Sequence, residues 1–457
     1  MPRLDLFRSL HPALPPEEWS AVARDPSSER DPELRAYRSG FWATIPIGPR
    51  AEPGELRLAA VAELGDGRIV TAPLGTVTAV ARPERLSIDG PERKGSPLIA
   101  VCMTTFNPDL RLFRTQIESL RGQTDPDWVC FISDDCSEFG RFEAITDVVA
   151  GDDRFVLTRA PERLGFYRNF ERVLGLVPDE AELVALCDHD DRWYPDKLET
   201  LRAAIGDAEL AYSDVRLVDV EGRVRGETLW RDRRNNHTNL ASLLISNSIV
   251  GASCLFRRRA IDSALPFPRS PGWDFHDHWL ALVALSLGDL AYVDRPLYDY
   301  VQHPSAVLGR VASEPETDQP DERRGLPGLL ERRHGLLTRW RAAYFTAYLQ
   351  RVLQAQTLLA RCSADLTPSK RRALRLFEAA ARSPVALAWL AARPLRALTG
   401  ANETLGMEKV LVRGILWRHL IQLRARRRPR DASADASVPS FDPKALGGSR
   451  RRWLANR

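Results

Sequence analysis

Between residues 97 and 310, short apolar runs alternate with segments of helical length. Five runs rich in Val, Ile, Leu, Phe and Cys show this pattern: 98–104, 128–133, 154–158, 183–187 and 210–213. The alternation predicts βαβ units and a mostly parallel sheet with helices on both faces, an α/β fold. Ligands of such sheets bind outside the carboxyl ends of the strands, so the polar residues that follow each run are the candidates for function.

The composition places few limits on this interpretation. The chain has 457 residues, enough for two to four domains, with 44% hydrophobic and 28% charged residues and a net charge of +4. So small an excess argues against wholesale binding of nucleic acid or membrane by charge alone. Only five of the 65 basic residues are Lys, a bias that makes any single Arg poor evidence of function.

Cysteine usage and the N-terminus bear on location. Six Cys occur without a C-x-x-C pair, which is typical of reduced, intracellular thiols. The first residues are charged where a signal peptide needs an apolar core, and no run reaches the about 20 apolar residues of a membrane helix. We expect a cytoplasmic protein that is soluble or peripheral at the cytoplasmic face of the inner membrane.

Residues 1–96 predict a small β-rich module. Residues 55–64 and 68–71 read as strands joined through Asp66-Gly67, a pair that suits a type I′ hairpin turn. The module is interpreted either as a carbohydrate-binding or oligomerising appendage or as a packing annex without chemistry of its own.

The C-terminal third predicts three parts. Residues 311–326 read as a linker, 327–428 as a helical region with helices near 329–362, 370–393 and 407–423, and 429–457 as a disordered basic tail. Residues 401–457 contain 13 Lys and Arg against 5 Asp and Glu. With the apolar stripe Val412, Leu416 and Leu420, this indicates either a membrane-surface helix with a basic tail or a packed helix with a solvated tail.

The segment 183–198 carries the most informative carboxylates. An apolar run leads into Asp188, Asp190 and Asp191, and alternation along an extended chain places the first two on one side and the third on the other. Such carboxylates suit Mg²⁺ or Mn²⁺ held together with the phosphates of a nucleoside diphosphate. An isolated acidic loop is usually a solvated turn, but here three further residues follow at fixed offsets: Trp193, Pro195 and Lys197.

Two other runs also end in polar residues. Asp134 and Asp135 follow the run that begins at Val129, and a carboxylate there can accept the N3–H of uracil or thymine. Thr104 ends the first run, and Phe106 after it offers a ring on which a base can lie. Each pair alone also fits ordinary turn chemistry or core packing.

Taken in order, these motifs resemble glycosyltransferase family 2, whose members have the GT-A fold. The resemblance spans residues 97–309 and is nearest to the rhamnosyltransferase-like branch of bacterial surface-polysaccharide enzymes. It rests on Thr104-Thr-Phe-Asn, Asp134-Asp-Cys-Ser, Leu164-Gly-Phe-Tyr-Arg-Asn-Phe, Asp188-His-Asp-Asp-Arg-Trp, Gly251-Ala-Ser-Cys-Leu-Phe and His276-Asp-His-Trp. The first motif has Phe106 where Tyr is commoner, which removes a hydroxyl and keeps the ring.

The resemblance implies a role for each matching position. The nucleotide sugar would contact Thr104, Phe106, Asp134 or Asp135, Arg168, Asn169 and Asp188. The metal would be held by Asp188 and Asp190, with Asp190 as the direct ligand, and His303 is a further candidate ligand that can equally be structural. Asp277 would be the general base or simply a helix cap, and Trp279 would contact the acceptor sugar or simply pack.

These roles describe an inverting glycosyltransferase that uses a UDP- or dTDP-sugar and Mg²⁺ or Mn²⁺. Its acceptor would be a hydroxyl of a glycan or lipid-linked molecule in cell-surface polysaccharide synthesis, and no nucleic acid would be bound. The alternative is a non-catalytic glycan-binding or scaffold protein that retains a GT-A domain. A nucleotidyltransferase is less favoured, because the chain lacks a Gly-rich, Lys-containing first loop.

Overall fold

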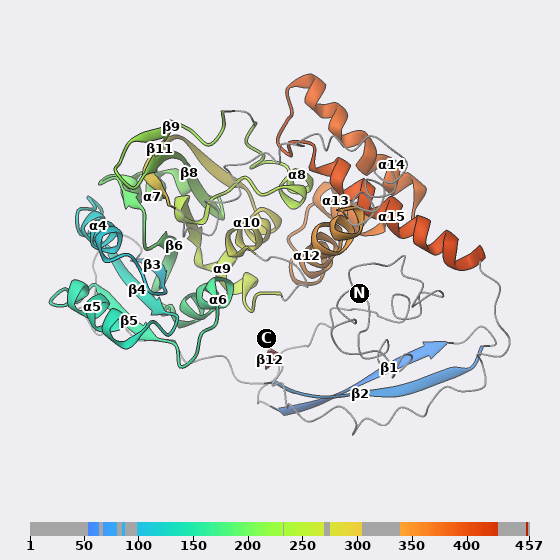
Figure 1. Ribbon diagram of the computed structural model, residues 1–457, viewed down its shortest axis with the longest axis horizontal. Coiled ribbons are helices and arrows are strands. Elements are labelled where there is room, and N and C mark those ends of the chain that lie inside the picture. Colours follow the sequence, from blue (N-terminus) through green and yellow to red (C-terminus); the bar gives the residue numbers. More distant parts are fainter. Residues whose placement is uncertain are drawn as a thin grey trace, which may run out of the picture. The chain divides into compact units, whose positions relative to one another are not determined.

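The computed structural model describes eight stretches of the chain: residues 54–63, 67–79, 85–86, 98–231, 233–268, 275–303, 339–427 and 454–455. Figure 1 shows these parts as ribbons. The chain divides into two compact units, residues 1–84 with 420–457 and residues 85–419. The expected linker 311–326 and nearly all of the expected tail 429–457 lie outside the described residues.

The smaller unit contains the hairpin predicted from the sequence. Strands β1 (Gly54–Glu63) and β2 (Ile69–Ala79) pair antiparallel, with Glu63 opposite Ile69, and Gly67 in the turn has a φ of 81°. The short strand β12 (Leu454–Ala455) pairs parallel with β2.

The larger unit is built on a nine-stranded sheet in the order β5-β4-β3-β6-β10-β8-β11-β7, with β9 paired to β8. Its strands are β3 (Leu98–Thr105), β4 (Trp128–Asp134), β5 (Phe155–Arg159), β6 (Ala181–Asp188), β7 (Arg192–Trp193), β8 (Leu210–Asp219), β9 (Val224–Gly226), β10 (Cys254–Arg257) and β11 (Leu290–Gln302). Strands β3 to β6 are parallel, as the alternating pattern predicts, and β10 runs antiparallel between β6 and β8.

Helices connect these strands and continue after them. They are α4 (Leu110–Arg121), α5 (Phe139–Val149), α6 (Phe166–Leu176), α7 (Lys197–Ile205), α8 (Leu240–Ile245), the 3₁₀ turn η1 (Gly251–Ser253), α9 (Arg258–Ala264) and α10 (His276–Leu287). The C-terminal region holds the π-helical turn η2 (Ala343–Tyr348), α12 (Leu349–Arg361), α13 (Pro368–Ala379), α14 (Pro384–Ala392), the 3₁₀ segment η3 (Arg393–Thr399) and α15 (Met407–Arg427).

The predicted helix over 370–393 is two helices. The first ends at Ala379, and Ser383 caps the second by accepting a hydrogen bond from the backbone N–H of Ala386. Pro384 then occupies the first turn of α14, where its missing N–H is not needed. A capping Ser followed by Pro favours the start of a new helix, and this preference outweighs the apolar periodicity that continues across both residues.

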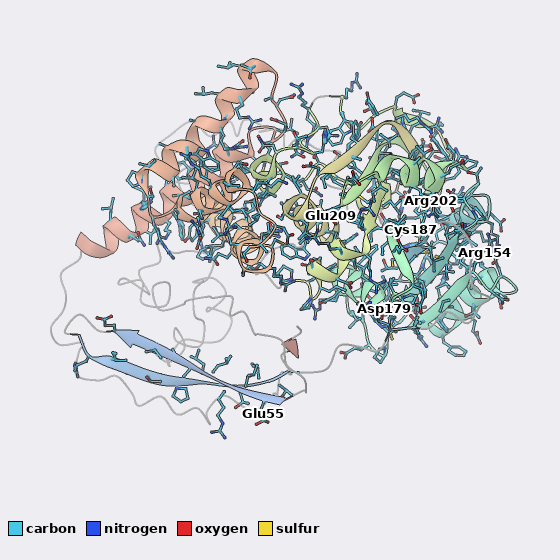
Figure 2. All side chains as sticks on the ribbon, turned by 180° about the vertical axis from the view of Figure 1, so that it is seen from behind. Glu55, Arg154, Asp179, Cys187, Arg202 and Glu209 are labelled. Carbon is cyan, nitrogen blue, oxygen red and sulfur yellow. The ribbon has the colours of Figure 1, made fainter. Side chains whose placement is uncertain are left out.

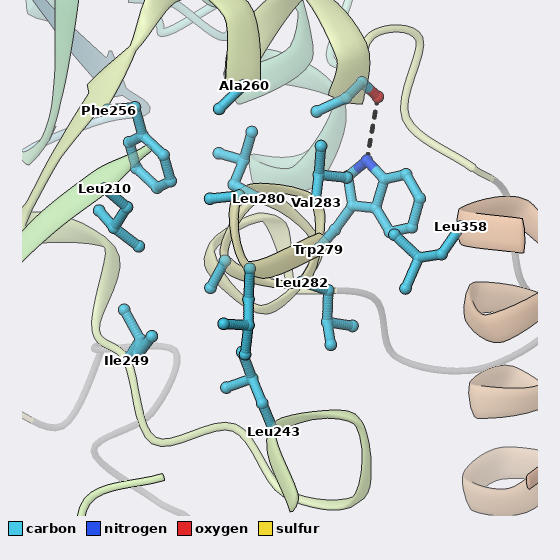
Figure 3. Packing of buried hydrophobic residues seen from close by; sticks show 14 of the residues in the cluster. Leu210, Leu243, Ile249, Phe256, Ala260, Trp279, Leu280, Leu282, Val283 and Leu358 are labelled. Carbon is cyan, nitrogen blue, oxygen red and sulfur yellow. Dashed lines mark hydrogen bonds between the residues drawn. The ribbon is translucent and has the colours of Figure 1, made fainter. Parts of the chain in front are cut away.

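Side chains bury on both faces of the sheet because neighbouring strand residues point to opposite sides. In β3, Ala100 and Cys102 belong to one apolar cluster, while Val101 and Met103 belong to a second cluster on the other face. The first cluster also surrounds α10, where Trp279 and Leu358 of α12 lie together in Figure 3. The C-terminal helices therefore share a core with the sheet.

All six Cys are free thiols, as the sequence predicts. Among the described helices, none is both long and apolar enough to span a membrane.

Candidate functional site

The carboxyl ends of β3, β4 and β6 lie level with one another. Thr104 is opposite both Ser133 and Asp188 in the sheet register, and Thr105 is opposite Asp134. Cys187, labelled in Figure 2, is the last buried residue of β6 before Asp188. Three of the motifs quoted above therefore meet at one edge of the sheet.

Asp190 and His303, two candidate metal ligands, are in direct contact. Nε2 of His303, at the end of β11, lies 2.7 Å from Oδ2 of Asp190. The bond to Asp190 raises the pKa of His303. Burial works to raise the pKa of Asp190, but His189 and His303 outweigh it and lower that pKa. A hard carboxylate oxygen and an imidazole nitrogen thus converge from segments far apart in the sequence.

The pKa values of the neighbouring carboxylates, Asp188 and Asp191, are raised, whereas that of Asp190 is lowered. Burial, together with the charges of Asp190 and Asp277, raises the pKa of Asp188 to about 7. Burial likewise raises the pKa of Asp191, which is 1% exposed. Its Oδ1 accepts a hydrogen bond from the backbone N–H of Val301 (3.1 Å), and its Oδ2 is buried without a partner in the described part of the chain. Burial and the like charges of the motif therefore outweigh the nearby cation Lys197 at Asp188 and Asp191.

This donor set fits a cation only in part. Within the described ranges, no group of three or more His, Cys, Asp and Glu side chains is arranged to hold a metal ion. Mg²⁺ and Mn²⁺ are, however, commonly held by one or two protein carboxylates plus substrate phosphates. Asp190 with His303 would supply two ligands, which leaves the remaining positions to a diphosphate.

Asp134 is fully buried and both of its oxygens accept hydrogen bonds. It accepts hydrogen bonds from Thr105 Oγ1 (3.0 Å), Ser137 Oγ (2.5 Å) and the backbone N–H of Ser137 (2.8 Å). Asp135 accepts one bond on each oxygen, from the backbone N–H groups of Leu164 (2.6 Å) and Gly165 (2.9 Å). Asp135 keeps a free lone pair on each oxygen, whereas Asp134 keeps one on Oδ2 alone, so Asp135 has the greater capacity to accept a hydrogen bond from a base.

Phe106 directly follows β3 at this edge. Its ring is half-buried and lies beneath an arginine. The guanidinium of Arg163 stacks 3.9 Å from the ring centroid. Arg163 belongs to the loop that Asp135 holds through Leu164 and Gly165. Sequence reasoning gave this exposed Arg no role, because the chain-wide excess of Arg hides any single one.

The Arg168-Asn169 pair lies on α6 with both side chains engaged. Asn169 is 1% exposed and exchanges two hydrogen bonds with Ser133, donating to its backbone oxygen (2.8 Å) and accepting from its hydroxyl (2.6 Å). Arg168 forms an ion pair with Glu171 one turn along the helix. Asn169 thereby ties α6 to the end of β4.

Asp277 lies in the first turn of α10, as its position before an apolar helical run predicts. Burial raises its pKa to about 6, although backbone N–H groups of His278 and Gly251 donate to the carboxylate and oppose this. Gly251 approaches closely: a Cβ there would lie 3.3 Å from that of Asp277 and 3.1 Å from Nε2 of His276. The buried carboxylate is also close enough to Asp188 to raise its pKa.

Trp279 lies in the core and away from this edge. Its side chain is 1% exposed, and its indole N–H donates to the backbone oxygen of Ala264 (3.0 Å, Figure 3). An acceptor sugar has no access to a ring buried in this way. Of the two interpretations given to Trp279, the structure favours packing, so we do not carry it into the proposed site.

Lys197 follows the acidic motif at a fixed offset, but the sequence analysis assigned it no function. It is fully buried, burial lowers its pKa to about 7, and its amine donates to the backbone oxygen of Ala252. The fixed offset from the acidic motif marked the position, but nothing in the sequence shows that the side chain points inward.

The fold and the sequence together define a class. Residues 100–265 match the model of Glycosyl transferase family 2, a span that runs from β3 to the end of α9 and contains the acidic motif. This span is therefore similar to a glycosyl transferase family 2 domain, and it lies on a mixed, mostly parallel sheet. Asp277 and His303 lie beyond the matched span.

The individual proteins that this chain resembles share little sequence with it or match only part of it. The uncharacterized protein y4gI of Sinorhizobium fredii is 32% identical over 140 residues, which are 29% of this chain and only 15% of that protein. Residues 1–349 of S. aureus TarS, solved with UDP-GlcNAc, are 13% identical over 72% of this chain and 91% of that one, with a TM-score of 0.39. The mannosyltransferase PcManGT from Pyrobaculum calidifontis, solved with GDP-Man and Mn²⁺, is 16% identical over 70% and 86%, with a TM-score of 0.36. These values are too low to transfer a residue role or a ligand.

Proposed function

We propose that this protein is a metal-dependent, inverting glycosyltransferase. It would move a sugar from a UDP- or dTDP-sugar to a hydroxyl of a glycan or lipid-linked acceptor in the synthesis of a cell-surface polysaccharide, as in the rhamnosyltransferase-like branch. The observation that carries this proposal is the meeting of two groups at one sheet edge: the pair Asp190 and His303, and the buried carboxylate Asp277 near Asp188.

Inverting transfer needs a base on the acceptor side. Asp277 takes the proton of the acceptor hydroxyl as its oxygen attacks the anomeric carbon, and the nucleoside diphosphate leaves with the bonding pair. Because burial raises the pKa of Asp277 to about 6, it is ionised near pH 7 and still basic enough to accept a proton. A bound Mg²⁺ or Mn²⁺, held by Asp190 and His303 with Asp188, would neutralise the charge of the departing diphosphate.

The nucleotide of the donor is recognised by residues that follow β3 and β4. Asp135 accepts the N3–H of uracil or thymine, since it has more free lone pairs than Asp134, and Phe106 supplies the flat apolar face beside the base. Thr104 and the Asn169–Ser133 contact keep the ends of β3 and β4 level around the nucleotide. Arg168 lies one residue before Asn169 and supplies positive charge near the diphosphate.

The Asp277→Asn variant tests the assignment of the base. Asparagine keeps the shape and hydrogen-bond acceptor but cannot take a proton, so transfer to an acceptor should fall by about 10²-fold or more. Binding of UDP or dTDP with Mn²⁺, measured by calorimetry, should stay within about 3-fold of the unchanged protein. Full transfer by Asp277→Asn would show that another group is the base.

The alternative, a scaffold that retains a GT-A domain, is separated by the same binding experiment. A catalytic protein binds UDP or dTDP in the presence of Mn²⁺ and releases nucleoside diphosphate from one member of a panel of sugar nucleotides. A scaffold does neither. The division into residues 1–96, 97–310, 311–326, 327–428 and 429–457 is likewise proposed, with the central part as the catalytic domain.

We further propose that the protein works at the cytoplasmic face of the membrane and contacts anionic lipid through α15. One side of this helix is buried at Leu411 and Ile415. The other side exposes Leu416, Leu420 and Leu423 by 40, 43 and 50%, a spacing that aligns them on one face.

The charges around this face are suited to an anionic surface. Lys409 and Arg413 are exposed and stand two turns before Leu416 and Leu420, on the same side of the helix. The nearby acids point inward: Glu408 is 2% exposed and bonded to Thr404, and Glu403 is paired with Arg396. Exposed leucines beside lysine and arginine, without exposed acid, are typical of helices that lie on anionic bilayers.

A further inference from the structure

Lys197 is a fully buried lysine that holds together segments from three places in the chain. It starts α7, and its amine donates to the backbone oxygen of Ala252 in η1. The same nitrogen lies 3.3 Å from the ring centroid of Trp193 in β7 and 4.6 Å from that of Tyr298 in β11. Lysine is almost never fully buried unless its amine is paired, so this set of contacts defines its place.

The two rings belong to strands that carry the candidate metal ligands. Trp193 and Tyr298 are direct partners in the antiparallel ladder of β7 and β11. Asp190 lies just before β7, and His303 directly follows β11. The amine is therefore fastened between the two strands whose ends bring Asp190 and His303 to within 2.7 Å.

The carbonyl that accepts from Lys197 belongs to the segment that supports Asp277. Gly251, next to Ala252, donates its backbone N–H to the carboxylate of Asp277. A Cβ on Gly251 would lie only 3.3 Å from the Cβ of Asp277, so the two backbones are in close packing. A displacement of η1 is consequently transmitted to Asp277.

We propose that Lys197 is a positioning residue that fixes Asp277 relative to the Asp190–His303 pair. One link runs through Ala252 and Gly251 to the carboxylate, and the other runs through the rings of Trp193 and Tyr298 to β7 and β11. An amine donates an N–H to a carbonyl in either protonation state, so the link does not depend on the charge of Lys197. The structural link stands by itself, and its consequence for transfer rests on the proposed function.

The test compares Lys197→Met with Lys370→Met. Methionine keeps an unbranched apolar chain and removes the donor in both. Lys370 is a matched control, because its amine also caps a backbone oxygen, that of Gly288 (2.8 Å), but at the opposite end of α10 from Asp277. Hydrogen–deuterium exchange of the full-length protein without ligand reports on the amides of Gly251, Ser253 and His278.

In Lys197→Met these three amides should exchange at least about 10-fold faster than in the unchanged protein, whereas in Lys370→Met they should not change. Transfer by Lys197→Met should fall by at least about 10-fold in kcat, while UDP affinity stays within about 3-fold. Unchanged exchange at Gly251 and Ser253 would overturn the link. Changed exchange with unchanged kcat would overturn the positioning role.

The proposal remains testable if the unchanged protein is inactive or if Lys197→Met does not fold. If the unchanged protein transfers no sugar, the proposed function fails, but the exchange data still decide the link. If Lys197→Met does not fold, Trp193→Leu removes one of the rings that hold the amine, and the same amides should lose protection. Unchanged exchange in Trp193→Leu would then contradict the proposal.

Discussion

At the scale of single residues, a buried carboxylate has a cost in stability. Burial raises the pKa of Asp277 from 3.8 to about 6. The folded protein thus keeps a proton that the unfolded chain releases, and its stability falls as the pH rises from about 4 to about 6. At about 1.4 kcal/mol per unit of pKa, the ionised carboxylate costs up to about 3 kcal/mol above that window.

Asp277→Asn should therefore be more stable than the unchanged protein at pH 7.5, by up to about 3 kcal/mol, and the difference should shrink as the pH approaches 4. Urea unfolding at both pH values measures this. Asp219→Asn is the control of opposite sign, because Arg223 lowers the pKa of Asp219 to about 2, so its replacement should not stabilise. A less stable Asp277→Asn at pH 7.5 would contradict the argument.

The residue scale also shows what the sequence can predict of the site. The carboxylates after β4 and β6 lie at one edge, as expected, because the carboxyl ends of parallel strands share an edge. The sequence could not show that Asp134 and Asp135 differ in their free acceptor sites, since the difference depends on Thr105 and Ser137 turning toward Asp134. It also could not show that Trp279 points into the core, because an aromatic residue in the first turn of a helix can face either the core or a site.

At the scale of elements, β3 to β6 and the first residues of β8 were predictable from the sequence, and β7, β9, β10 and β11 were not. The apolar runs of β3 and β4 are continuous because both faces are buried. β10 has only four residues, within a longer uncharged stretch that has no strand period. β11 contains Asp294, Arg295 and Pro296, and its pairing with β8 shifts register there, so its sequence does not alternate.

One contact between elements makes a sharp prediction. Gly414 in α15 lies against η2, where a Cβ would be 2.6 Å from the backbone nitrogen of Tyr344 and 2.8 Å from its Cα. Gly414→Ala should lower the free energy of unfolding by about 3 kcal/mol or more, because backbone cannot move aside as a side chain can.

Gly140→Ala is the matched control. Gly140 lies within helix α5, and a Cβ there would meet nothing within 4 Å. That substitution should stabilise by up to about 1 kcal/mol, through the higher helix propensity of Ala. Thermal unfolding of both variants checks the pair, and equal effects would mean that α15 does not pack against η2 as described.

At the scale of the whole molecule, the exposed leucines of α15 predict binding to lipid. The protein should sediment with vesicles that contain phosphatidylglycerol, less with phosphatidylcholine alone, and be released by salt. Replacing Leu416, Leu420 and Leu423 together by Gln should abolish sedimentation. Val224→Gln, at a side chain 45% exposed on β9, should leave it unchanged. Equal sedimentation of all three proteins would remove α15 as the contact.

The place of β10 in the sheet sets the order in which the fold can be completed. β6 pairs on one side with β3, which precedes it in the chain, and on the other with β10, which is reached only at Cys254. During synthesis from the N-terminus, β3 to β6 can assemble first, while the far edge of β6 stays open until the segment 254–257 emerges. An open strand edge at the centre of a future sheet is a template for pairing with another chain. A pause in synthesis after β6 has left the ribosome and before residues 254–257 have left it would therefore leave the nascent chain prone to aggregation.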